Sequence, residues 1–386
     1  MTQSAPTIVA VGYNRPKSLA RLLTSLSKAH YPSEGVRLVI SLDNSGNPEP
    51  LKVAEAFDWP FGEKRIMARE TRLGLRQHIL SCGDLTEEYG EIIVLEDDLF
   101  VSPHFYDYTC KALDFYADAP QVAGISLYGN QQNQTAALPF TPIDDGGSDV
   151  YFMQLAASWG QAWSRRHWQG FRTWLSAHGT DISGVDGIPA DIRAWPESSW
   201  LKLYNAYIIS HDLYFVYPYR SLSTNFGDPG EHFYVASSRF QVPIQLKACD
   251  YRFARHDDSL AVYDAYCELL PASIKRLNGK LAGYDFSVNL YGCKPTVNGL
   301  QLTRSKQAGL LNFSLSMKPM ELSILYDLEG EGIALIEAAS LTAGSHSDPK
   351  AEYDAYRFFY KFPSVRVILF GVMERLTMLI KSARPG

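Results

Sequence analysis

The segment from Ile92 to Leu95 is an uninterrupted apolar run that ends in three consecutive acids, Glu96, Asp97 and Asp98. Runs of four to eight apolar residues are typical of buried strands, and ligands of open α/β sheets bind beyond the carboxyl ends of such strands. Adjacent carboxylates repel one another unless a cation or hydrogen bonds compensate them. The run therefore favours a site for a cation and phosphate. The alternative is a solvated acidic turn before the next helix.

Strand and helix patterns alternate along the first 130 residues. Apolar runs predict strands at 7–11, 36–42, 64–68, 91–96 and 122–127. Helical spacing of leucines follows Pro16, and further helices are predicted near 74–82 and 103–116. Strands that alternate with helices predict an α/β fold, with a mainly parallel sheet covered by helices on both faces.

Three polar positions follow predicted strands: Arg15, Asp43 and the acidic triplet. Since the carboxyl ends of parallel strands meet at one edge of a sheet, we expect these side chains to line one crevice. The sequence contains no Gly-x-Gly-x-x-Gly motif and no P-loop, so an acid, an arginine and a metal would have to hold a nucleotide instead. Two alternatives remain. Asp43 could cap the turn that follows it, and Arg15 could be an exposed residue at a helix start.

Composition excludes several classes of protein. The chain of 386 residues carries a net charge of −6, which argues against a nucleic-acid binder. No run of 18 uncharged apolar residues is present, and the first residues lack a secretory pattern. The five scattered cysteines form no Cys-x-x-Cys pair and predict reduced thiols without a zinc site. We expect a cytoplasmic protein, either free or peripheral at the inner face of the membrane.

Three segments together resemble the GT-A nucleotide-sugar glycosyltransferases: residues 7–15, 40–43 and 94–106. More narrowly, they are similar to N-acetylglucosaminyltransferase I and to related bacterial family-2-like enzymes of surface-polysaccharide synthesis, in which Glu-Asp-Asp replaces the commoner Asp-x-Asp. The resemblance covers residues 7–235. It implies a GT-A fold and inverting transfer of a sugar, with GlcNAc the nearest example. The donor would be a UDP-sugar used with Mn²⁺ or Mg²⁺, and the acceptor a glycan or a lipid-linked glycan.

The resemblance also implies roles for the residues at the strand ends. Asp98 would bind the divalent metal, and Glu96 and Asp97 would approach the ribose and the donor sugar. Asp43 would face the uracil, and Arg15 would lie beside the nucleotide.

Two further segments match parts of the family that surround the donor. Trp159 and Gly160 fall in an aromatic-glycine segment that lines the donor sugar. Residues 217–232 are similar to a loop that closes over the bound donor; Ser221 and Asn225 would contact diphosphate or sugar, and His232 would ligate the metal or touch phosphate. The alternative for His232 is an ordinary surface or hydrogen-bonding histidine.

The catalytic base is the position where the sequence departs from the family. The family places a carboxylate just before a helix that begins near a tryptophan, and alignment on Trp200 puts Ser198 at that position. Because a serine cannot act as a base at neutral pH, we take its neighbour Glu197, with Asp191 and Asp212 as alternatives. A charge in the first turn of the helix is the other explanation of Glu197.

The expected domains are a catalytic unit at 1–270, a small β-rich unit at 271–345 and amphipathic helices at 346–386. The catalytic unit would consist of a nucleotide-binding half, 1–130, and an acceptor and lid half, 131–270. The basic C-terminal helix suits either peripheral membrane contact, or packing on its own chain or a second subunit.

A catalytically silent sugar- or nucleotide-binding homologue is the alternative function. A nucleotidyltransferase is weaker, because the basic glycine-rich loop is missing.

Overall fold

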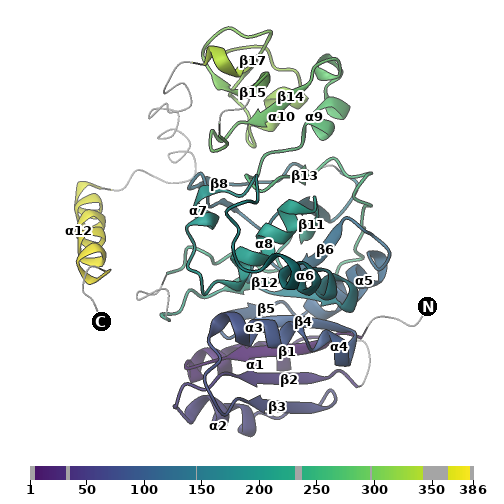
Figure 1. Cartoon of the computed structure of the whole chain (residues 1–386), viewed down its shortest axis with the longest axis vertical. Helices are drawn as coiled ribbons and strands as arrows, with labels where there is room; N and C mark the ends of the chain where they lie inside the picture. Colours follow the sequence, from purple (N-terminus) through teal and green to yellow (C-terminus); the bar gives the residue numbers. More distant parts are fainter. Residues whose placement is uncertain are drawn as a thin grey trace.

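A nine-stranded mixed sheet forms the centre of the computed structural model, which describes residues 5–31, 35–144, 146–230, 237–295, 298–341 and 364–382 (Figure 1). In spatial order its strands are β13 (Val262–Tyr263), β9 (Val150–Met153), β11 (Tyr214–Pro218), β6 (Val122–Ser126), β10 (Gln161–Ser164), β4 (Glu91–Glu96), β1 (Thr7–Gly12), β2 (Leu38–Leu42) and β3 (Lys64–Ala68). Strands β3, β2, β1 and β4 run parallel, whereas β10 lies antiparallel between β4 and β6. The prediction of an α/β fold with a mainly parallel sheet is confirmed.

The central sheet is covered on both faces. Successive side chains of a strand point to opposite faces, and here both sets are apolar. In β1, Ile8 belongs to one hydrophobic cluster and its neighbour Val9 to the other. The first cluster also contains side chains of α1 (Pro16–Ser27) and α5 (Phe105–Phe115). The second contains side chains of α3 (Leu75–Gly83), α6 (Arg165–His178) and α8 (Trp200–Ser210). Both faces are therefore buried, which explains why β1 and β4 read as continuous apolar runs.

Local sequence explains where the site-bearing elements begin. Pro16 occupies the first turn of α1, where its fixed φ suits the helix and its missing N–H costs nothing. The leucines of α1 recur at helical spacing and are buried against the sheet. Strand β4 ends at Glu96, and after a two-residue turn at 97–98 the chain forms β5 (Leu99–Val101), which pairs with β12 (Ser223–Asn225).

The remaining short elements connect these layers. They are α2 (Glu49–Ala56), α4 (Thr86–Tyr89), α7 (Ala190–Arg193), α9 (Pro271–Leu277), two 3₁₀ turns (Gly279–Leu281 and Ala338–Ser340), and the pair β7 (Gln132–Asn133) and β8 (Leu138–Pro139). All five cysteines are free thiols.

A second, four-stranded sheet follows the central one and confirms the β-rich C-terminal region. Its order is β14 (Phe286–Asn289), β15 (Leu300–Ser305), β17 (Gly332–Glu337) and β16 (Leu311–Ser314). Its inward residues, among them Val288 and Leu335, continue the hydrophobic cluster that contains α8. Within the β-rich unit the apolar run at 322–326 also predicts a strand, but this prediction is wrong, because those residues lie in and directly after α10 (Glu321–Leu325). Periodicity cannot separate strand from helix in so short an apolar run.

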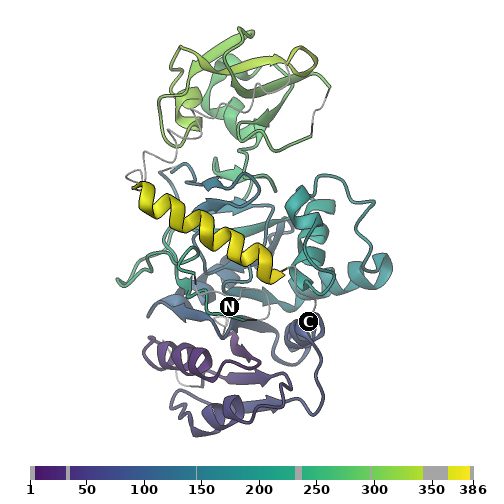
Figure 2. The ribbon, with the colours of Figure 1, turned by 90° about the vertical axis from the view of Figure 1, so that its left-hand side faces the viewer.

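Near the C-terminus, α12 (Val365–Ser382) forms the helix that the apolar stripe predicted; the earlier part of that expectation, up to residue 363, lies outside the described residues. Figure 2 shows α12 as a single straight helix. Within the described ranges, no helix combines the length and the apolar character needed to cross a bilayer.

Candidate functional site

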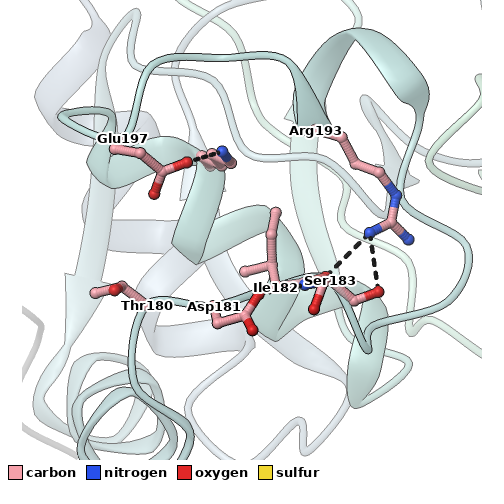
Figure 3. Close-up of a pocket in the computed structure, with 7 residues that line it drawn as sticks. Thr180, Asp181, Ile182, Ser183, Arg193 and Glu197 are labelled. Atoms are coloured by element: carbon pink, nitrogen blue, oxygen red, sulfur yellow. Dashed lines mark hydrogen bonds and ion pairs between the residues drawn. The ribbon is translucent and has the colours of Figure 1, made fainter.

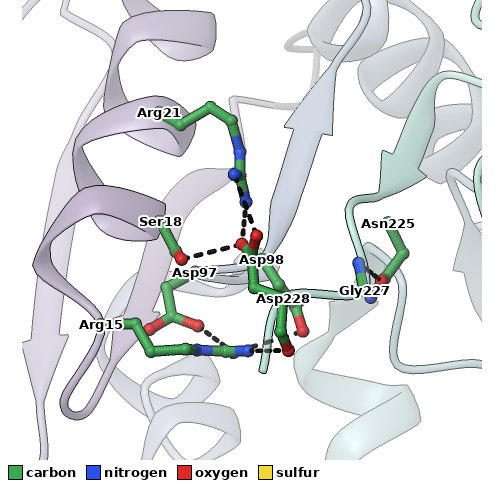
Figure 4. Close-up of polar contacts among 8 residues, drawn as sticks. All are labelled: Arg15, Ser18, Arg21, Asp97, Asp98, Asn225, Gly227 and Asp228. Atoms are coloured by element: carbon green, nitrogen blue, oxygen red, sulfur yellow. Dashed lines mark hydrogen bonds and ion pairs between the residues drawn. The ribbon is translucent and has the colours of Figure 1, made fainter. Parts of the chain in front are cut away.

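The acidic turn and Arg15 meet at the carboxyl ends of two adjacent parallel strands. Register pairs Val11 of β1 with Glu96 of β4, so the residues that follow the two strands emerge at the same edge of the sheet. The Nη2 atom of Arg15 donates to Oδ1 of Asp97, and it also lies 3.2 Å from Oδ2 of Asp98 (Figure 4). The expected convergence of Arg15 with the acidic triplet is therefore what the chain forms.

A distant loop completes this cluster. Because β12 pairs with β5, the backbone N–H of Phe226 donates to the carbonyl of Asp98 at 2.9 Å, and Asp228 then reaches α1. The carboxylate of Asp228 accepts from Ser18 Oγ at 2.8 Å and from both terminal nitrogens of Arg21 (Figure 4). The Arg21 guanidinium also lies over the Phe226 ring, 3.8 Å from its centre.

Burial shapes the charges of the cluster. Asp97 is almost fully buried, and this raises the pKa of its carboxyl to about 6 although Arg15 lowers it. Burial, followed by repulsion from Asp98 and Asp97, raises the pKa of Glu96 well above its usual value. Burial alone would lower the pKa of Arg15, but the two aspartates raise it, so the guanidinium stays charged. Oε1 of Glu96 is buried without a hydrogen-bond partner among the described residues.

Asp43 lies at the end of β2 and is held by backbone amides. Its carboxylate accepts from the N–H groups of Asn44 at 2.9 Å, Leu73 at 2.7 Å and Gly74 at 2.9 Å. The contact with Asn44 caps the turn after β2, as the alternative for Asp43 predicts, and the other two contacts tie this turn to the start of α3. The same residue also lines a pocket of about 240 Å³, together with Tyr13 and residues 44–48. The position is thus compatible with both interpretations.

Trp159 and Gly160 lie beside the same edge of the sheet. The Trp159 ring packs between Tyr128 and Phe240, with ring centres 4.7 Å and 4.6 Å away. Its carbonyl accepts from Ser223 of β12. Gly160 has a φ of +97°, and an added Cβ would come within 3.2 Å of Leu127 and Ser223. Glycine is therefore required here by backbone conformation and close packing.

Ser221 precedes β12 and Asn225 is its last residue, and the side chains of both bind within the protein. Ser221 Oγ donates to the Ser223 carbonyl at 2.6 Å and accepts from the Gly129 N–H at 2.8 Å. Asn225 Oδ1 accepts from the Gly227 N–H, which shapes the loop that presents Asp228. His232 lies outside the described residues.

Glu197 lies just before α8. Its side chain is 75% exposed and accepts from Nζ of Lys202 at 2.6 Å, and this hydrogen bond lowers the pKa of Glu197 (Figure 3). It lines a pocket of about 440 Å³ together with residues 180–183 and Arg193. That pocket shares no lining residue with the pocket at Asp43. Of the alternatives, Asp191 accepts from Thr135 at 2.9 Å and Asp212 from Gln154 at 2.6 Å.

The donor atoms at the acidic turn suit a hard divalent cation. Asp98 presents a carboxylate that is less buried than that of Asp97, and Mg²⁺ and Mn²⁺ prefer such oxygen ligands. Among the described residues, no group of three or more His, Cys, Asp or Glu side chains is placed so that it could hold a metal ion by itself. One or two carboxylates together with substrate phosphates commonly hold Mg²⁺. The residues therefore fit a cation that binds with a diphosphate.

Sequence reasoning missed four polar residues of this region: Ser18, Arg21, Asp228 and Gln161. Arg21 and Asp228 are 207 residues apart, so no local pattern could connect them. Gln161 opens β10 and is fully buried, and both polar atoms of its side chain lack partners among the described residues. Native proteins rarely leave a buried amide unpaired, which marks Gln161 as a position that a ligand or a water would satisfy.

Comparison with known proteins identifies no family. No family model matches the sequence, and no curated protein matches it. Among solved structures, Staphylococcus aureus TarS 1–349 matches with a TM-score of 0.38 and 14% identity, over 56% of this chain and 59% of TarS. Its complex with UDP-GlcNAc matches with a TM-score of 0.37 and 12% identity, over 59% of this chain and 60% of that one.

A third structure is the Pyrobaculum calidifontis mannosyltransferase PcManGT in complex with GDP-Man and Mn²⁺, with a TM-score of 0.34 and 13% identity over 56% of this chain and 55% of that one. The chain thus spans less than two thirds of each of these structures. The scores are too low to transfer any property, so the α/β assignment rests on the order and direction of this chain's own strands.

Proposed function

We propose that this protein is an inverting, metal-dependent glycosyltransferase that moves a sugar from a UDP-sugar to a glycan or lipid-linked acceptor. The observation that carries the proposal is the meeting of Arg15, Asp97 and Asp98 at the carboxyl ends of β1 and β4. In open α/β sheets this edge is where ligands bind. The resemblance of residues 7–235 to GT-A enzymes supports the same function and suggests GlcNAc as the sugar.

The strand-end cluster would hold the diphosphate of the donor. Asp98 is the metal ligand in this proposal, since its side chain is more exposed than that of Asp97. When bound, the cation would stabilise negative charge on the leaving UDP. The guanidinium of Arg15 has the planar donor geometry that binds phosphate oxygens in pairs. Glu96 and Asp97 would orient the ribose and donor sugar.

The flanking residues would hold the two ends of the donor. The pocket at Asp43 and Tyr13 would take the uracil. Trp159, packed beside β12, would lie against the sugar, and Gly160 would let the backbone approach it closely. Ser221 and Asn225 act in this proposal by shaping the β12 loop, because their side-chain oxygens already bind within the chain.

An inverting transfer needs a base that removes a proton from the acceptor hydroxyl. We propose Glu197, which is ionised at neutral pH and lies at the edge of an open pocket large enough for part of an acceptor. Lys202 stabilises the ionised carboxylate and thereby weakens it as a base. That ion pair is also the observation that favours the second candidate, a catalytically silent homologue that binds nucleotide or sugar.

The first experiment measures UDP release from a panel of UDP-sugars with Mn²⁺, for the wild type and for Asp98→Ala. We expect Asp98→Ala to lower turnover by about a hundredfold or more, because the cation contributes several kcal/mol of charge stabilisation. The exposed Asp118→Ala variant is the matched control and should retain full turnover. If Asp98→Ala keeps both UDP binding and turnover, the metal assignment is wrong.

The second experiment separates the enzyme from the silent homologue. Glu197→Gln should lower kcat with a glycan acceptor while leaving the Kd for UDP unchanged, and Asp181→Asn, from the same pocket, should change neither. Metal-dependent UDP binding by the wild type without release of UDP from any donor would favour the silent homologue.

A further inference from the structure

The described side chains of α12, residues 365–377, leave most of their apolar groups exposed. Seven of them are between 52% and 71% exposed: Val365, Val367, Leu369, Phe370, Val372, Met373 and Leu376. Figure 1 shows α12 set apart from both sheets. In the described part of the chain, neither hydrophobic cluster includes a side chain of α12. Apolar surface of this extent is typical of an interaction site.

These residues are not spread evenly around the helix. At 100° per residue, Val365, Leu369, Val372 and Leu376 fall on one side, with Ile368 and Met373 at its flanks. Phe370 and Val367 lie outside this sector. The apolar sector is therefore about 140° wide. This is broader than the narrow a/d seam of a two-stranded coiled coil.

Basic residues border this sector. Arg366 lies at one edge and Arg375 at the other, whereas Val367 and Glu374 lie on the opposite side. The sequence of α12 contains three basic residues and one acidic residue, whereas the whole chain has a net charge of −6. The helix is thus a positive segment on an acidic protein. Arginines beside an apolar face can lay their stems along acyl chains while the guanidinium reaches a lipid phosphate.

We infer that α12 docks on an anionic lipid surface, with its apolar sector in the headgroup region and Arg366 and Arg375 at the phosphates. A second copy of the chain fits less well, since 18 residues provide fewer than the three or four heptads of a stable coiled coil. The helix lies on the surface and does not span it, in keeping with its length and charge. The inference is independent of the proposed catalytic function.

The test uses the full chain and vesicles of phosphatidylcholine, either pure or with about one third phosphatidylglycerol. Co-sedimentation should show binding to the anionic vesicles that falls as salt is raised, and much weaker binding to the neutral ones. Replacing both Arg366 and Arg375 by Gln should reduce the affinity for anionic vesicles about tenfold or more, because each basic residue contributes about 1 kcal/mol there. Equal binding of the wild type to both kinds of vesicle, or to neither, would refute the inference.

A matched pair of substitutions tests the orientation. Val372 lies in the apolar sector and Val367 on the opposite side, and both are just over half exposed. Val372→Ser should weaken vesicle binding about tenfold, while Val367→Ser should leave it within about twofold. If both substitutions weaken vesicle binding equally, the proposed orientation of α12 is wrong. If Val372→Ser instead converts a dimer into a monomer in light scattering, a second copy covers α12 and the lipid inference is wrong. Both variants should keep the thermal unfolding midpoint of the wild type, because neither side chain belongs to the core.

Discussion

Two groups of buried carboxylates behave differently in this fold. At the acidic turn, Asp97 faces the guanidinium of Arg15, which also approaches Asp98. Near the start of the second sheet, Glu268 and Glu321 are equally buried but poorly compensated. Glu268 accepts one hydrogen bond, from the Tyr291 N–H at 2.7 Å, and neither oxygen of Glu321 has a partner among the described residues.

The difference appears when Asp97 is compared with Glu268 and Glu321. Glu96 of the acidic turn, whose Oε1 has no partner among the described residues, resembles the second group, because burial raises its pKa to about 8. Burial raises the pKa of Glu268 to about 8, although Lys294 lowers it, and raises that of Glu321 to about 7. Asp97, similarly buried, reaches only about 6 because Arg15 opposes the effect of burial. A buried acid that keeps an arginine partner can stay ionised and available to a ligand. One without such a partner holds its proton to higher pH and acts as a neutral group.

The largest effect should come from removing the compensating charge at the acidic turn. Arg15→Met should lower the free energy of unfolding by about 3 kcal/mol at pH 8, because it leaves the buried Asp97 without its partner. The loss should be smaller at pH 5, where Asp97 is protonated. Urea unfolding at both pH values provides the measurement.

Arg65→Met is the control for that prediction. Arg65 pairs with Glu88 on an exposed surface, so the change should cost well under about 1 kcal/mol at either pH. If the two variants lose the same free energy of unfolding, Arg15 stabilises the protein no more than an exposed ion pair does, and the prediction is wrong.

An effect of similar size and opposite sign is expected at the second group. Folded Glu321, with its pKa near 7, keeps a proton that the unfolded chain loses near 4.5, so wild-type stability should fall as pH rises between these values. Glu321→Gln removes this dependence. Between pH 4.5 and pH 8, the variant should therefore gain about 3 kcal/mol relative to the wild type.

Thermal or urea unfolding across this pH range checks the prediction, with the exposed Glu331→Gln as a control that should not change the profile. A Glu321→Gln profile parallel to that of the wild type would show that Glu321 is compensated after all. The turnover of Glu321→Gln with UDP-sugars should equal that of the wild type, since Glu321 has no part in the proposed donor site.

The smallest effect concerns the loop that completes the first group. Arg21→Met and Asp228→Asn should each destabilise the protein, and a double-mutant cycle should give a coupling of about 1 kcal/mol, since the pair is about one quarter exposed. Because Arg15 also donates to the Asp228 carbonyl, both variants should weaken UDP binding by a few-fold. Zero coupling would mean that Asp228 does not hold the loop against α1.

Much of the fold follows from local patterns. Strands β3 and β4 have the predicted bounds, and the bounds of β1 and α1 are close to the predicted ones. The reason is that an apolar run or a 3.6-residue repeat can be recognised from consecutive residues alone. The position of β10 could not be read in this way. Four residues carry little periodicity, and only pairing with β4 and β6 makes them a strand.

The candidate site divides similarly. The proximity of Arg15 to the acidic turn follows from two parallel strands ending at one edge, so strand assignment was sufficient to predict it. The amides that hold Asp43, the partner of Glu197 and the link from Arg21 to Asp228 needed the folded chain.

The sequence by itself determined the α/β class, the strand ends that carry Arg15, Asp43 and the acidic triplet, and the basic amphipathic helix near the C-terminus. The tertiary structure decided which charges are compensated: Asp97 by Arg15, Asp228 by Arg21, and Glu321 by none of the described groups. The physical reason is the distance along the chain over which each effect acts. Periodicity and capping act over a few neighbouring residues, whereas burial and charge pairing depend on which distant segments the fold brings together.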